Sequence, residues 1–154
     1  MKWIGRVVDS IAEEAVVTTK PFEIVNDSGA TASHNVEYLI NDADGGEFLL
    51  PTAIQDSEII VNIGTTITSN QLQIQAPSGQ LLLGFAFLAN MDSADDAEST
   101  YFSPDGSDDR AISLNGGTTG GFIGDRIVLS YFSEGVWKVT AFLSHTGTAA
   151  TPFL

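Results

Sequence analysis

The chain has 154 residues, 43% of them apolar, which is enough for a single domain with a hydrophobic core of its own. Six lysines and arginines stand against 20 aspartates and glutamates, and the net charge of −14 disfavours nucleic acid and anionic membranes as partners. There is no cysteine, which excludes disulfides, cysteine-based zinc sites and thiol catalysis.

Residues 1–32 are interpreted as an N-terminal arm. Asp9 or Ser10 is suited to cap a short helix over residues 11–16, whereas the β-branched run 16–19 favours a strand. The start lacks the continuous apolar stretch and cleavage site of a signal peptide.

An apolar cluster flanked by Lys2 and Arg6 marks the beginning of this arm. Exposed apolar clusters usually mark contact surfaces, and the cations would be drawn to an acidic partner. The alternative is that the arm is the first strand of the domain. The candidate contact residues are Trp3, Ile4, Arg6, Val7 and Val8.

From residue 33 to 154 short apolar runs alternate with turn residues. The last two runs are joined by the short connection 133–135 and predict a β-hairpin. No fixed-period repeat is evident. The predicted strands are 36–40, 47–50, 58–63, 71–75, 81–88, 111–114, 126–132 and 136–143.

This pattern predicts an all-β fold, specifically an antiparallel β-sandwich or jelly-roll-like domain over residues 33–154 preceded by the arm. Leu72, Ile74 and Ala76 alternate with glutamines, which is typical of a strand with one solvated face. The apolar run 81–89 is too short to span a bilayer.

Acidic residues gather in the polar segment 91–110, and such long loops are often functional or mobile. Asp105, Asp108 and Asp109, like the acids of 42–45, are suitable ligands for a hard cation, but neither segment has the full calcium-loop pattern. A solvated acidic loop is the favoured interpretation, and no metal or cofactor is assigned.

Catalytic patterns are lacking. No Gly-x-Ser-x-Gly motif surrounds a serine, and His145 is interpreted as a surface residue of a polar C-terminal tail. The glycine-rich segment 116–121 has no lysine after it, so it reads as a flexible turn rather than a phosphate cradle. Trp3 and Trp137 could each stack on a sugar, but a core or interface position is the favoured interpretation for both. We expect a non-enzymatic protein.

Three segments together resemble virion proteins of tailed bacteriophages. The opening Met1-Lys2-Trp3-Ile4-Gly5 is similar to that of structural and fibre proteins, especially from marine phages. Residues 42–51, with a turn, a strand and Leu-Pro, and the closing segments 124–129 and 135–139 resemble a β-module of such proteins. The resemblance to the β-module spans residues 35–145, but fibre proteins with this start usually continue for hundreds of residues.

The resemblance implies a capsid decoration or head-fibre protein on the outside of the virion, without catalytic residues. Its expected partners are the major capsid protein or another virion protein, and the expected assembly is a homotrimer. The alternative is a receptor- or carbohydrate-binding module at a tail tip, using the 91–110 loop with Tyr101 and Phe102. A secreted glycan-active enzyme is a third, less favoured class.

Overall fold

A computed structural model describes residues 19–27, 29–92 and 98–154, and within them the chain forms strands and no helix. The prediction of an all-β chain is confirmed for this part. No helix there is long and apolar enough to cross a membrane. The strands are β1 (Phe22–Val25), β2 (Ala30–Thr31), β3 (Glu37–Ile40), β4 (Gly46–Leu49), β5 (Glu58–Ile63), β6 (Leu72–Gln75), β7 (Leu81–Asn90), β8 (Thr100–Phe102), β9 (Ala111–Leu114), β10 (Arg126–Ser133) and β11 (Val136–His145).

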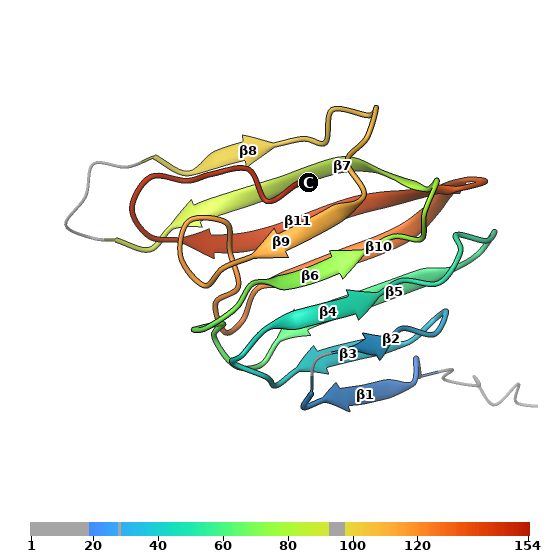
Figure 1. Cartoon of the computed structure of the whole chain (residues 1–154), viewed down its shortest axis with the longest axis horizontal. Helices are drawn as coiled ribbons and strands as arrows, with labels where there is room; N and C mark the ends of the chain where they lie inside the picture. The colour runs from blue at the N-terminus through green and yellow to red at the C-terminus, as the bar shows by residue number, and fades with distance from the viewer. Residues whose placement is uncertain (1–18, 28, 93–97) are drawn as a thin grey trace, which may run out of the picture.

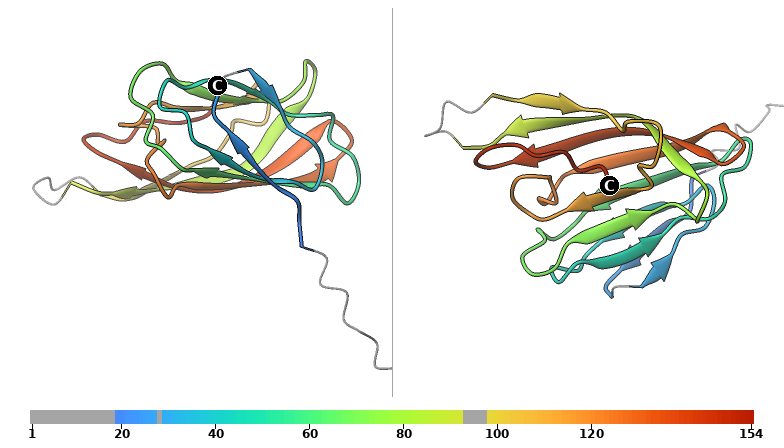
Figure 2. Two further views of the ribbon diagram at one scale, coloured as in Figure 1. Left: turned by 90° about the horizontal axis from the view of Figure 1, so that it is seen from below. Right: turned by 45° about the horizontal axis from the view of Figure 1, so that its top comes forward.

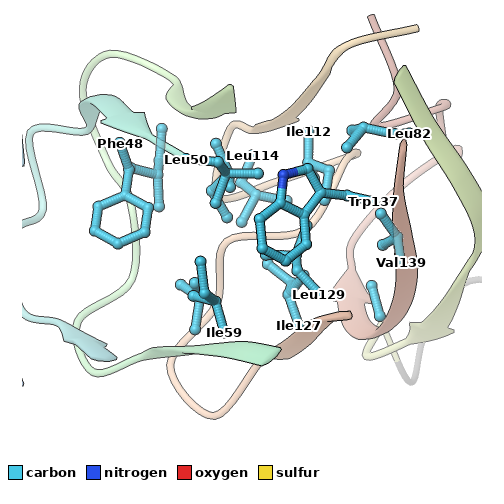
Figure 3. Close-up of a cluster of buried hydrophobic side chains, with 14 of the residues drawn as sticks. Phe48, Leu50, Ile59, Leu82, Ile112, Leu114, Ile127, Leu129, Trp137 and Val139 are labelled. Carbon is cyan, nitrogen blue, oxygen red and sulfur yellow. The ribbon is translucent and has the colours of Figure 1, made fainter. Parts of the chain in front are cut away.

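The strands form two sheets that lie in two layers (Figures 1 and 2). The larger has seven strands in the order β1-β3-β5-β10-β11-β7-β8, and the smaller has four in the order β2-β4-β6-β9. Apolar side chains from both layers meet between them and are buried (Figure 3). Trp137 of β11 is fully buried there, and its indole Nε1 donates a hydrogen bond to the Pro51 carbonyl at 3.2 Å.

Between β1 and β6 the chain crosses from one layer to the other at each step. β1, β3 and β5 lie in the larger sheet, whereas β2, β4 and β6 lie in the smaller one. Each return brings the chain back in the same direction, so neighbours within this winding are parallel. The expected antiparallel arrangement is therefore wrong: both sheets are mixed.

Successive turns of this winding have unequal lengths. Glu37 pairs with Phe22 on one side and with Ile60 on the other. The segment from Phe22 to Glu37 is therefore shorter than the segment from Glu37 to Ile60. The unequal connections explain why the sequence shows no fixed-period repeat although the chain winds regularly.

The predicted hairpin at the end of the chain is confirmed. β10 and β11 are antiparallel, with a bulge between Tyr131 and Ser133. The hairpin lies in the middle of the larger sheet, where β10 pairs with β5 and β11 pairs in parallel with β7 along ten residues of each strand. Both central strands bury alternate residues, as their sequences predict.

Two strands that the sequence did not predict, β1 and β2, belong to the segment assigned to the N-terminal arm. They pair with β3 and β4 at the edges of the two sheets. Residues 1–18 lie outside the described residues, so the division of the chain at residue 32 stays a prediction.

Candidate contact surface

The larger sheet has one face on the core and one face directed away from the smaller sheet, here called the outer face. No described strand covers the outer face in the left view of Figure 2. On β7 the core residues Leu82, Ala86 and Leu88 alternate with Phe85 and Phe87, which are only partly buried. Phe85 and Phe87 therefore lie on the outer face.

Four aromatic side chains form a patch on this face, here called the aromatic patch: Phe85, Phe87, Tyr101 and Phe142. Phe142 of β11 is paired with Phe87 of β7, and Phe87 is paired with Tyr101 of β8. The ring of Tyr101 lies 4.9 Å from that of Phe87 and 6.1 Å from that of Phe85, centre to centre. Tyr101 is 67% exposed and Phe142 56% exposed.

Two ion pairs lie on the outer face, on the strands toward β1 from the aromatic patch. Arg126 donates from a guanidinium nitrogen to Glu37 Oε1 at 3.1 Å and to Asn62 Oδ1 at 2.9 Å. The hydrogen bond from the Asn62 amide, followed by that from Arg126, lowers the pKa of the Glu37 carboxyl below its usual value. Lys20 pairs with Glu58 on β5.

The acidic loop 105–109 is a compact turn. Asp105 accepts hydrogen bonds from the Ser107 amide at 2.7 Å and the Ser107 hydroxyl at 2.8 Å, and these bonds lower its pKa. Oxygens of Asp105, Asp108 and Asp109 all lie within 4.8 Å of one another, so the acids do converge. Asp105 and Asp108 are exposed and their partners are atoms of the same turn, which agrees with the expected solvated loop.

The interpretation of His145 as a surface residue is wrong. His145 ends β11 and is fully buried, because the C-terminal segment is folded against the protein instead of extending as a tail. Its Nδ1 lies 3.1 Å from the Gly147 carbonyl, which can only accept, so Nδ1 is the protonated ring nitrogen. His34 stacks at 6.2 Å on the indole of Trp137. Both imidazoles therefore have packing roles.

The glycine-rich segment 116–121 is held by hydrogen bonds to two side chains. Asn115 Oδ1 accepts from the amides of Gly117 and Thr119, and Asp125 Oδ2 accepts from the amide of Gly121 at 2.8 Å. Asp125 is 2% exposed, and burial raises the pKa of its carboxyl above the usual value. The segment leads into the last hairpin as expected, but through a defined hydrogen-bonded turn.

Of the aromatic pair considered from the sequence, only Tyr101 belongs to the surface, because Phe102 packs against the core. The predicted contact residues Trp3, Ile4, Arg6, Val7 and Val8 lie outside the described residues. Sequence reasoning missed Phe85, Phe87 and Phe142. A signal for the first two was present: the run 81–89 is apolar at consecutive positions, which indicates a strand with apolar side chains on both faces.

Comparison with known proteins gives no relative for this chain. No protein-family model matches it, and no curated protein or solved structure is significantly similar.

Proposed function

We propose that this chain is a non-enzymatic structural protein of a bacteriophage virion that decorates the capsid exterior as a homotrimer. The observation that carries the proposal is the uncovered outer face with its aromatic patch, in a chain of net charge −14. An apolar face suits association with other proteins, and an acidic remainder keeps assembled particles apart in solution.

The residues that could have suggested catalysis have roles in packing. His145 is buried with its Nδ1 on a backbone carbonyl, and His34 stacks on Trp137. Asp125 accepts amide hydrogen bonds that shape a turn. These contacts within the fold are what supports the non-enzymatic part of the proposal.

Attachment to the particle is assigned to the start of the chain, with Trp3, Ile4, Arg6, Val7 and Val8 as the contact residues on the major capsid protein or another virion protein. The described chain enters the fold at β1, an edge strand whose Phe22 and Ile24 are each 56% exposed. An apolar arm arriving at this edge could reach a neighbouring surface without crossing the core.

Deletion of residues 1–14 tests this assignment. The deleted stretch lies before β1 and the core, so we expect the melting temperature to remain similar while binding to particles that lack the protein is lost. The matched control is Ile123→Thr in the full-length chain, which removes an exposed apolar side chain far from the start. Unfolding of the truncated chain would place the arm in the domain, and retained binding would place the anchor elsewhere.

The alternative function, a receptor- or carbohydrate-binding module of a tail tip, is favoured by one observation: Tyr101 is exposed within an aromatic patch, and aromatic rings can stack on sugars. Quantitative mass spectrometry of purified particles from the source virus separates the two functions. Decoration of a symmetric shell requires on the order of hundreds of copies, whereas a tail tip holds a few to a few dozen. Absence of the protein from the particles would refute both.

A further inference from the structure

We infer that the outer face of the larger sheet, centred on the aromatic patch, is the surface through which copies of this chain bind one another. The partner is a second copy of the chain. This inference rests on the homotrimer of the proposed function and names its contact surface; because it concerns the free protein, its test can fail while the virion role stands.

The apolar side chains of this face form continuous rows across the sheet. One row runs from Phe142 through Phe87 to Tyr101 on adjacent strands. Beside it, Phe85 is paired with Thr140, which is paired in turn with Val128. Aligned rows of large side chains make a flat surface that another sheet can contact at about 10 Å, the spacing of packed sheets.

Charge is distributed unevenly between this face and the loops around the sheets. Of the carboxylates in the described residues, eleven lie in connections between strands, where they surround the sheets: Asp27, Asp42, Asp44, Asp56, Asp92, Glu98, Asp105, Asp108, Asp109, Asp125 and Glu134. The two on the outer face, Glu37 and Glu58, are each paired with a cation. Lys138 adds a third positive charge to the face.

This arrangement favours a second copy as the partner. Two chains of net charge −14 repel each other in most orientations, since their loops are acidic. When the outer faces of neighbouring copies of the oligomer come together, apolar surface is buried and the acidic loops remain at the rim in water. The nearly balanced face is therefore a side from which one copy can approach another with little repulsion.

The area of the face is of the same order as that of a stable contact. Seven strands at about 4.8 Å spacing, with the longest about 33 Å, give a face of several hundred Å². A standard protein interface uses roughly 800 Å² on each partner.

The test is the mass of the purified full-length chain by light scattering, together with two substitutions. We expect the wild type to have a multiple of 16.3 kDa. Phe142→Thr and Tyr101→Thr, on different strands, should each raise the dissociation constant at least about 30-fold, the effect of losing a central aromatic contact. Ile123→Thr is the matched control, because Ile123 is also 67% exposed but precedes β10 in a loop, and it should leave the mass unchanged.

Salt gives an independent measurement. Screening reduces the repulsion between two acidic chains, so self-association should become tighter between about 50 and 500 mM sodium chloride. Three results would overturn the inference: a single-chain mass at high concentration, an oligomer insensitive to both aromatic substitutions, or a monomer whose Tyr101 instead binds a glycan. Near-wild-type circular dichroism of both variants ensures that a loss of mass reports contact and not unfolding.

Discussion

Asp125 is the residue whose surroundings differ most from those of an ordinary surface carboxylate. Its Oδ2 lies 2.8 Å from the amide nitrogen of Gly121 and 3.1 Å from that of Phe122, and Ser144 also donates to the carboxyl. Burial nevertheless outweighs these bonds and raises its pKa above 3.8. The folded state therefore binds a proton at Asp125 more tightly than the unfolded chain does.

The sign of the resulting pH dependence follows from this difference. Because the folded pKa is the higher one, the contribution of Asp125 to stability is largest below about pH 3.8 and falls as the pH rises through the raised pKa. Asp125→Asn keeps an acceptor oxygen but cannot ionise, so we expect this part of the pH dependence to disappear. Urea unfolding of both proteins from pH 3 to 7 measures it.

Glu37 provides a comparison of opposite sign. Its pKa is lowered from 4.5, mainly by the Asn62 hydrogen bond, so its contribution is present above that pH and is lost as the pH falls. Glu37→Gln should therefore alter only the acidic limb of the profile. A wild-type profile that Asp125→Asn leaves unchanged would show that the carboxyl has the same pKa in both states.

At the scale of elements, the pairing of β7 with β11 depends on one glycine. Gly84 has φ +123°, and a Cβ placed there would lie 2.0 Å from the Val139 carbonyl oxygen. We expect Gly84→Ala to cost about 3 kcal/mol or more, since the two central strands would have to separate. Gly79→Ala is the control: its φ is +81°, but no atom lies within 4 Å of the added Cβ, so only the backbone cost of about 1–2 kcal/mol applies. Equal losses of melting temperature would contradict the close approach.

The edge of β9 is protected by the end of the chain. The amides of Arg110 and Ala111 donate to the Leu154 carbonyl, the amide of Ser113 donates to the Pro152 carbonyl, and the Phe153 side chain is 4% exposed. Removing residues 152–154 uncovers a strand edge and takes a phenyl ring from the core, which together favour aggregation and cost about 3–5 kcal/mol.

A melting curve with light scattering measures both effects of this deletion. Leu154→Ala, which keeps the backbone and changes only an exposed side chain, should behave like the wild type. Unchanged stability after the deletion would mean that the terminal residues do not cover β9 in solution.

Strand positions were predictable from the sequence, whereas strand directions were not. Short runs bounded by turn residues placed β5 and β9 at their observed residues, although both strands are buried at consecutive positions and show no alternation. Parallel pairing of β3 with β5 depends on the chain crossing to the other layer between them, and local patterns do not encode that crossing. β8 was missed because three residues are too few to show a period.

The contact surface was predictable only in part. Tyr101 was singled out for its chemistry, but its neighbours come from β7 and β11, and only the register of β11 on β7 brings Phe142 beside Phe87. Register across a parallel pair is a property of the folded sheet. The burial of His145 likewise follows from the return of the chain end, which its polar surroundings in the sequence do not indicate.

For the whole molecule, the position of the last hairpin determines when the protein can fold during its synthesis. β5 and β7 are made early, yet they are separated in the sheet by β10 and β11, which are made later. A nascent chain ending at residue 120 therefore has two open strand edges and a core without Trp137.

We expect a fragment of residues 1–120 to show no cooperative melting, and addition of a peptide of residues 121–154 to restore it with a blue shift of Trp137 fluorescence. Cooperative melting of the fragment alone would show that the winding from β1 to β6 is a folding unit by itself. If the fragment is unfolded, the nascent chain needs protection from aggregation until β10 and β11 emerge.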